Sequence, residues 1–354
     1  MSLNMLSIEH KKDLIRKNWI LQEVEEVPFL IEIGPFHAAT TRFFSDDDAE
    51  LAWNVNFHRQ REVIYDYGIP NIKPNQGIGI IASAFGCKYI INDEADPWIK
   101  PLICEENVND VYKLEVPDPV NHPVYKRAYN RLKFFQSHSD LPLRLANLPS
   151  PLVTASLIWD YTSFIVAMMI YPKEVHALME KVTAATIDYI KEQLRRIKNL
   201  FTMGHEMWYI PRDLGVRISD DTAALMSPNL YREFGVKYNS LISRAFGGLV
   251  VHSCGDVQNV VEPMMEIEGL RGLDFTIPQN PNWEVIRKAA AGKTALNLRH
   301  YYWDHGKDTQ VDLAEYSRKL IEFFGQKGIF IQTSTPTSEE ARDLGKKLHH
   351  ILHR

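Results

Sequence analysis

The sequence is short of three things: cysteine, excess charge of one sign and long apolar runs. Among its 354 residues the only cysteines are Cys87, Cys104 and Cys254. Such an odd and sparse set argues against a disulfide framework and suits a reducing compartment. The formal net charge of −5 provides no positive field for phosphate backbones, so nucleic acid is not expected as a partner.

No apolar run reaches the roughly 18 residues that a membrane span needs, and residues 1–12 contain no apolar signal-peptide core. We therefore expect a cytoplasmic protein without a membrane partner. What is present is an ordinary globular composition, with 45% hydrophobic and 24% charged residues, which is enough to bury a large core. The sequence does not settle the oligomeric state, and a homodimer stays open.

Residues 1–150 form an irregular zone. A helix is predicted over 7–18, a strand over 27–33 and an amphipathic helix over about 47–66. Prolines and glycines then divide residues 70–123 into short pieces, which indicates loops and small strands around a site rather than a linker. We expect this zone to supply the first strands, a lid and loops.

From residue 151 onward the pattern becomes regular, with short strands alternating with helices. The predicted strands cover residues 151–154, 207–210, 249–251, 273–275, 294–298 and 329–331. The predicted helices lie near 156–168, 172–198, 256–267, 282–291, 311–325 and 337–352.

This alternation is typical of consecutive βαβ units, which build parallel strands that are buried on both faces. A doubly wound sheet and a closed barrel both satisfy it. The chain length favours a single-domain (β/α)8 TIM barrel over residues 1–354, and so do polar residues that follow several strands and would meet at one mouth. The Rossmann-like alternative depends on the glycines of residues 77–82, which no hydrophobic strand precedes.

The most chemically informative segment is His252-Ser253-Cys254-Gly255, directly after the apolar residues 249–251. Residues two apart on a strand point to the same side, so His252 and Cys254 can share a metal ion. Imidazole and thiolate are ligands that suit zinc, and Gly255 permits a sharp turn into the next helix. Packing and capping roles for the two residues, without a metal, are the alternative.

Residues 250–256, together with 219–221 and 227–234 upstream, resemble the uroporphyrinogen decarboxylase superfamily. Within it, the H-x-C-G motif resembles the branch of cobalamin-dependent methyltransferases. The similarity extends more faintly from about residue 150 to the C-terminus, and the first 100 residues match poorly. The resemblance implies transfer of a methyl group from methylcobalamin, carried by a corrinoid partner protein, to a thiol or a pterin acceptor, with zinc activating the nucleophile.

The resemblance also implies a zinc ion held by His252, Cys254 and a later cysteine after the last strand. This chain departs from that pattern, because Thr333 or Ser334 stands where the third thiolate is expected. A neutral hydroxyl is a poor zinc ligand, so another group must complete the site. Spacing along the chain does not choose among the candidates, which are His205, Glu206, Asp220, Asp221 and His300.

The predicted site contains four catalytic residues and four substrate-binding residues. The catalytic ones are His252, Cys254, Asp220 and Asp221, and those expected to contact substrate are Trp208, Asn297, His300 and Tyr301. One alternative is a metal-free barrel that binds a small molecule or a tetrapyrrole. The other is uroporphyrinogen decarboxylase itself, although the arginine-rich motif of that enzyme has no counterpart in residues 33–42.

Overall fold

The structure is a computed structural model that describes residues 6–34, 46–72, 74–91, 97–146, 148–197, 199–201, 208–305 and 311–353. Its α-helices are α1 (Ile8–Trp19), α2 (Asp47–Arg61), α3 (Ile80–Ala84), α4 (Pro123–His138), α5 (Pro151–Ile158), α6 (Tyr161–Ile170), α7 (Pro172–Arg196), α8 (Pro228–Leu230), α9 (Lys237–Phe246), α10 (Val261–Met264), α11 (Trp283–Ala290), α12 (Leu313–Phe324) and α13 (Ser338–Leu352). Its strands are β1 (Phe29–Ile33), β2 (Lys88–Ile90), β3 (Trp98–Lys100), β4 (Leu143–Arg144), β5 (Leu200–Phe201), β6 (Val216–Ser219), β7 (Leu249–Ser253), β8 (Leu270–Thr276), β9 (Ala295–Arg299) and β10 (Ile329–Thr335).

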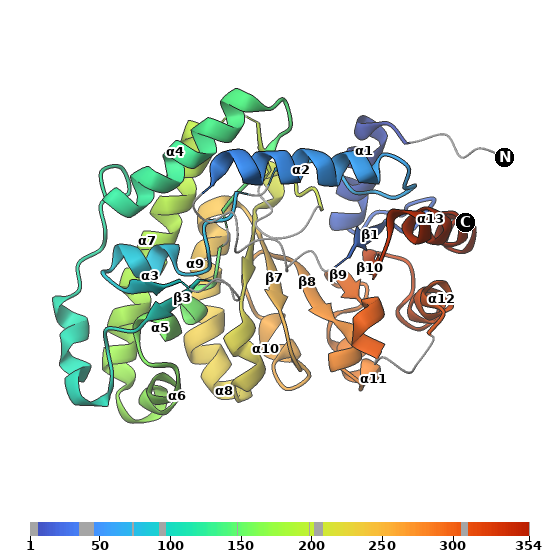
Figure 1. Ribbon diagram of the computed structural model, residues 1–354. Coiled ribbons are helices and arrows are strands. Elements are labelled where there is room, and N and C mark those ends of the chain that lie inside the picture. Colours follow the sequence, from blue (N-terminus) through green and yellow to red (C-terminus); the bar gives the residue numbers. More distant parts are fainter. Residues whose placement is uncertain are drawn as a thin grey trace.

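Six parallel strands in the order β1-β10-β9-β8-β7-β6 form a curved half-barrel at the centre of the molecule (Figure 1). The strands β7, β9 and β10 are buried along their whole length, as expected for parallel strands covered on both faces. This arrangement agrees with the predicted βαβ alternation from residue 249 onward. The carboxyl ends of the six strands therefore lie at the same edge.

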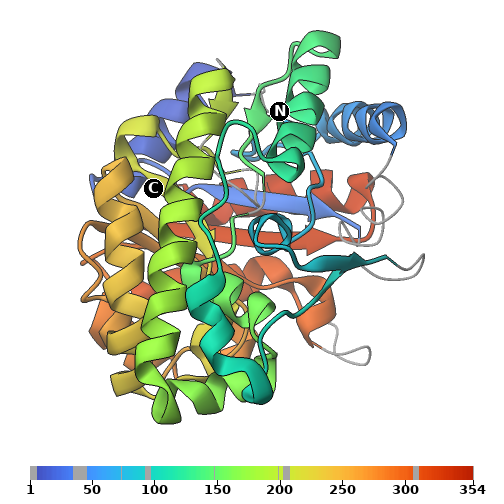
Figure 2. The ribbon, with the colours of Figure 1, turned by 90° about the vertical axis from the view of Figure 1, so that its left-hand side faces the viewer.

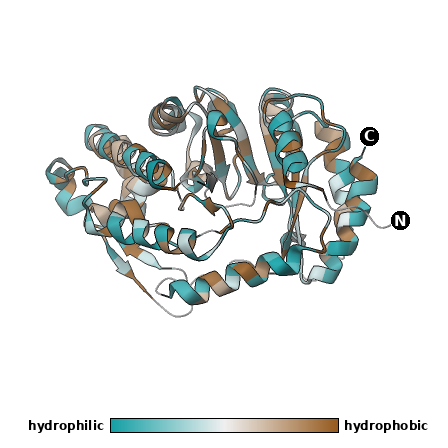
Figure 3. Ribbon diagram, turned by 90° about the horizontal axis from the view of Figure 1, so that it is seen from above, coloured by the Kyte–Doolittle hydropathy of each residue, from teal (hydrophilic) through white to brown (hydrophobic). Residues whose placement is uncertain are grey.

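The two helices that follow β9 and β10 begin at side-chain caps. At α13 the hydroxyl of Thr337 accepts the Glu340 N–H at 3.2 Å, while the Glu340 carboxylate accepts the Thr337 N–H at 3.1 Å. At α12 the Asp312 carboxylate accepts two backbone N–H groups. Each such cap stabilises a helix by about 1 kcal/mol. Hydrophilic and hydrophobic residues alternate along the helices that surround the sheet, so each can turn an apolar face to it (Figure 3).

Backbone contacts extend the half-barrel beyond both of its edges. Tyr67 donates its N–H to a carbonyl oxygen of β1 at 2.9 Å. Two parallel bridges continue from there, one between Ile72 and Leu143 and one between Pro149 and Ser219, the last residue of β6. Two segments of the N-terminal zone thus connect one edge of the sheet to the other.

Two sequence predictions of strands were wrong. Residues 151–154 begin helix α5 instead of a strand, because the Ser150 hydroxyl accepts the Val153 N–H at 3.0 Å and Pro151 fits the first helical turn. Residues 208–210 are not a strand, and residue 207 of that prediction lies outside the described residues. The apolar, β-branched character of such short runs does not separate a strand from a buried helix. The 16-residue helix α4 was not predicted at all.

The longest helix, α7, runs beside α9 on the outside of the sheet (Figure 2). It carries charged residues over its whole length. Within the described parts of the chain, no helix combines the length and the apolar character that crossing a bilayer would require.

Candidate active site

His252 and Cys254 lie at the carboxyl end of β7, where the chain turns at Gly255 with a φ of +102°. The buried imidazole and the exposed thiol face each other, with 3.1 Å between His252 Nε2 and Cys254 Sγ. Asp221 completes the group, since its Oδ1 accepts the Cys254 N–H at 2.7 Å and lies 3.8 Å from His252 Nε2. One potential ligand atom from each of the three residues lies within 4.8 Å of the others.

The pairing of β6 with β7 explains why Asp221 lies beside His252 and Cys254. In the parallel register Ser219 is opposite His252. Asp221 and Cys254 each lie two residues beyond these partners, so an equal offset from two neighbouring strands brings them together. The sequence named Asp221 among several candidates, and the structure places it beside His252 and Cys254.

The orientation of the His252 ring is fixed from the neighbouring strand β8. Its Nδ1 lies 3.0 Å from the backbone carbonyl oxygen of Asp274, so Nδ1–H donates to that oxygen. The other ring nitrogen, Nε2, is then left facing Cys254 and Asp221. Metal-binding histidines commonly have their second nitrogen held in this way.

Asp274 is the centre of a buried ionic cluster directly behind His252. Its carboxylate accepts from Arg217 Nη2 at 2.6 Å, lies 3.1 Å from Arg299 Nε, and approaches His252 Nδ1 at 3.3 Å. Burial disfavours its charge, but the positive charges of Arg299 and Arg217 outweigh burial and lower the pKa of Asp274. Burial and Arg299 also oppose a proton on His252, yet the charge of Asp274 prevails and the pKa of His252 is raised.

Gln332 on β10 connects three of the four predicted substrate-binding residues. Its Oε1 accepts from Asn297 Nδ2 at 2.8 Å and from Trp208 Nε1 at 3.1 Å, and its Nε2 donates to the Tyr301 hydroxyl at 3.0 Å. The same amide nitrogen donates to Glu32 on β1 at 2.9 Å. A polar layer therefore runs from β8 to β1 inside the half-barrel, and Asn297 also donates to the carboxylate behind His252.

Asp220 is fully buried, in contrast to the exposed Cys254. Its carboxylate accepts from the Ser150 hydroxyl at 2.7 Å, and from the Tyr231 hydroxyl and Asn239 Nδ2 at 2.8 Å each. Burial raises the pKa of Asp220, and these three donors offset that effect only in part. The structure thus gives Asp220 contacts with elements that surround the site.

The remaining candidates are spread more widely. His300 is buried against α12, where its Nε2 lies 2.9 Å from the Ser317 hydroxyl. Thr333 and Ser334 are buried in β10, and the Ser334 hydroxyl accepts the Tyr302 N–H at 3.3 Å. Two of the third-ligand candidates, His205 and Glu206, lie outside the described residues, and so does Arg42 of the segment 33–42.

Sequence reasoning missed four buried polar residues that shape this site. They are Arg217, Asp274, Arg299 and Gln332. Each occupies a buried position in its strand, two residues from another polar position of the same strand or at its end. A polar residue at an inward position of a buried strand is the signal that could have found them.

Comparisons with known proteins agree with this architecture. The family model of uroporphyrinogen decarboxylase (URO-D) matches residues 40–203. The match includes part of the first 100 residues, where the sequence had seemed a poor match, and it ends before the segment with His252 and Cys254. No curated protein matches the chain.

Two solved structures are similar at low sequence identity. A methyltransferase from Methanosarcina mazei is 13% identical, with a TM-score of 0.70 over 98% of this chain and 99% of that chain. A vitamin-B12 independent methionine synthase candidate from Listeria monocytogenes is 11% identical, with a TM-score of 0.40 over 68% of this chain and 74% of that chain. The family match and the first structure imply a TIM barrel, and the six parallel strands form an open, curved part of one. The chain is therefore similar to the uroporphyrinogen decarboxylase family over residues 40–203, and its fold resembles that of the methyltransferase.

Proposed function

We propose that this protein is a methyltransferase that moves a methyl group from a corrinoid protein to a thiol or pterin acceptor, with zinc held by His252, Cys254 and Asp221. The observation that carries the proposal is the convergence of one imidazole, one thiol and one carboxylate, with ligand atoms within 4.8 Å of one another. The fold likeness to a methyltransferase supports the reaction class.

The proposal includes a closed (β/α)8 barrel. The Tyr67 N–H bond to β1 and the Ser219 N–H bond to the carbonyl oxygen of Leu148 suggest where the two remaining strands would lie, near residues 67–72 and 143–149. In such barrels the carboxyl ends of all strands face one mouth, which carries the active site. His252 and Cys254 follow this rule, because they lie at the carboxyl end of β7.

The donor set fits zinc. Imidazole nitrogen, thiolate sulfur and carboxylate oxygen are all ligands that zinc accepts, and Asp221 would replace the cysteine that the family resemblance places after the last strand. Cys254 and Asp221 are exposed, so a fourth position can remain open to substrate, as in catalytic zinc sites. When bound, zinc would supply a positive charge that stabilises the deprotonated form of a thiol substrate near neutral pH.

The chain's own residues would prepare this donor set. The Asp274 carbonyl oxygen keeps the proton of His252 on Nδ1, which leaves Nε2 available as a ligand. Arg217 and Arg299 balance the charge of Asp274, so the buried carboxylate does not need the metal as its counter-ion. Both guanidinium groups therefore pair with a carboxylate of the protein itself. This disfavours the decarboxylase alternative, because a substrate with many carboxylates needs several cationic side chains that face it.

Metal content and methyl transfer test the proposal together. We expect Cys254→Ser and Asp221→Asn to contain one zinc equivalent less than the wild type, measured by elemental mass spectrometry on untagged protein. Transfer from methylcobalamin to a small thiol should fall roughly 10- to 100-fold or more in both variants. Cys104→Ser is the matched control, because it removes a partly exposed cysteine outside the site.

Two outcomes would overturn different parts of the proposal. Equal zinc in Cys254→Ser, Asp221→Asn and the wild type would exclude this metal site and favour the metal-free barrel. Zinc lost as expected, but with no transfer to a thiol or to a pterin in the wild type, would exclude the methyltransferase and leave the metal site standing.

Arg299 should limit the zinc affinity of the site. Its Nη2 lies 3.0 and 3.1 Å from the two ring nitrogens of His252 and 3.9 Å from Cys254 Sγ, so its charge opposes a cation there. Two unit charges about 4 Å apart near a protein surface repel by about 4 kcal/mol, so Arg299→Met should lower the zinc Kd by roughly tenfold or more. Competition with a chromogenic chelator measures this, and Arg232→Met provides an exposed arginine control. An unchanged or higher Kd in Arg299→Met would contradict the expectation.

A further inference from the structure

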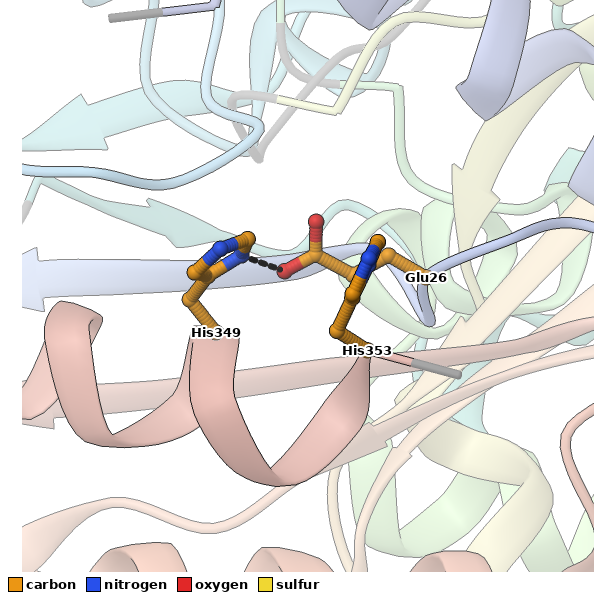
Figure 4. A group of neighbouring side chains, drawn as sticks. All are labelled: Glu26, His349 and His353. Atoms are coloured by element: carbon orange, nitrogen blue, oxygen red, sulfur yellow. Dashed lines mark hydrogen bonds and ion pairs between the residues drawn. The ribbon is translucent and has the colours of Figure 1, made fainter. Parts of the chain in front are cut away.

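Glu26, His349 and His353 form a second group of potential metal ligands (Figure 4). Glu26 precedes β1, so it lies at the amino-terminal edge of the parallel strands. His349 lies on the last turn of α13, and His353 directly follows that helix, one turn further along. One ligand atom from each residue lies within 4.8 Å of the others.

Backbone contacts fix the relative position of these side chains. Glu26 and His353 form an antiparallel bridge, and the Val27 N–H donates to the Leu352 carbonyl oxygen at 3.2 Å. The end of α13 is therefore tied to the start of β1 independently of the side chains. The geometry of the group does not depend on a mobile loop.

The Glu26 carboxylate is buried, with only 3% of the residue exposed, and each of its oxygens has a separate role. Oε2 accepts from the Tyr67 hydroxyl at 2.7 Å and faces the Tyr65 hydroxyl at 3.4 Å, whereas Oε1 lies 2.8 Å from His349 Nδ1. Burial, followed by the charge of Glu26, raises the pKa of both tyrosines, so their hydroxyls stay protonated as donors. The two phenols thus hold one oxygen and leave the other turned toward the imidazoles.

We propose that Glu26, His349 and His353 bind a divalent transition-metal ion of the zinc class. Two imidazole nitrogens and one carboxylate oxygen are a ligand set that zinc accepts, whereas calcium and magnesium prefer oxygen ligands alone. Tyr67 would orient the carboxylate from behind, as outer partners of metal ligands commonly do. His353 is exposed, so the ion can enter from solvent and keep a water molecule as its fourth ligand.

The role of this site would be structural. In barrels of this class the amino-terminal face contributes to stability and the carboxyl-terminal face to catalysis. A bound ion would join the last helix to the first strand and replace the present contact between His349 and Glu26. Because a ligand that binds only the folded state stabilises it, zinc should raise the Tm.

The test uses Cys254→Ser protein, purified without a tag and treated with a chelator, so that zinc bound near His252 does not contribute. We expect calorimetric titration with zinc to give one equivalent bound, and zinc to raise the Tm. Adding His353→Gln should abolish both effects, and Tyr67→Phe should weaken binding roughly 10- to 100-fold. His350→Gln is the matched control, because His350 is an exposed neighbour on the same turn.

Zinc binding that is equal in His353→Gln and His350→Gln would overturn this site. So would the absence of both zinc binding and a Tm rise in the Cys254→Ser parent. Since His353 is exposed, its substitution should leave the fold intact, which a chelated Tm equal to that of the parent would establish. Neither result bears on the methyltransferase proposal, which depends on the other edge of the sheet.

Discussion

Replacing Asp274 with Asn is expected to lower the free energy of unfolding by about 3–5 kcal/mol. The substitution preserves the size of the side chain but removes the negative charge that accepts a hydrogen bond from Arg217 and lies beside Arg299. All three side chains are nearly inaccessible, with 1% to 5% exposed. Removing one partner of a buried ion pair leaves uncompensated charge in a low-dielectric interior, which costs far more than the pair itself contributes. Urea denaturation at pH 7, followed by fluorescence, measures the loss.

The matched control is Asp213→Asn. Asp213 also accepts two hydrogen bonds from one arginine, at 2.7 and 2.6 Å from Arg16, but both side chains are exposed. The control should therefore lose only about 0–1 kcal/mol. If Asp274→Asn lowers the free energy of unfolding no more than the control does, the buried ionic cluster does not stabilise the fold as its geometry indicates.

The sequence predicted the strands that carry most of the site, but it did not predict how they pair. The apolar runs at 249–251, 273–275, 294–298 and 329–331 all became strands, because a buried parallel strand needs little beyond a short β-branched run. By contrast, β6 has a charged residue in its centre, Arg217, and went unrecognised. Its charge is compensated only by a partner on a strand distant in sequence, so no local pattern reveals it.

The failure to recognise β6 also explains why the third ligand could not be predicted. Without β6, the sequence contained no reason to place Asp221 opposite Cys254 and several equivalent acidic or imidazole candidates remained. The register of β6 on β7 settles which of the described candidates lies nearest. The polar layer around Gln332 was equally hidden, because its hydrogen bonds join strands far apart in the chain.

His58 should make the stability of this protein depend on pH in the acidic range. Its side chain is buried between α2 and the segment near residue 71, with Nε2 2.5 Å from the Asn71 carbonyl oxygen. Burial lowers the pKa of His58 from 6.5 to about 4. The folded state therefore holds a neutral imidazole at a pH where the unfolded chain already binds a proton.

The sign follows from that difference in proton binding. Since the folded pKa is the lower one, the contribution of His58 to stability is complete above about pH 6.5 and is lost progressively toward about pH 4. A difference of this size corresponds to about 3 kcal/mol. His58→Gln keeps an amide donor for Asn71 without titrating, so its free energy of unfolding should fall about 3 kcal/mol less than that of the wild type between pH 7 and 4. Urea denaturation at several pH values across this range measures the free energy of unfolding of both proteins. His350→Gln is the control for the loss of a histidine at an exposed position. If the free energies of His58→Gln and the wild type fall in parallel, protonation of the buried imidazole is not the cause of acid destabilisation.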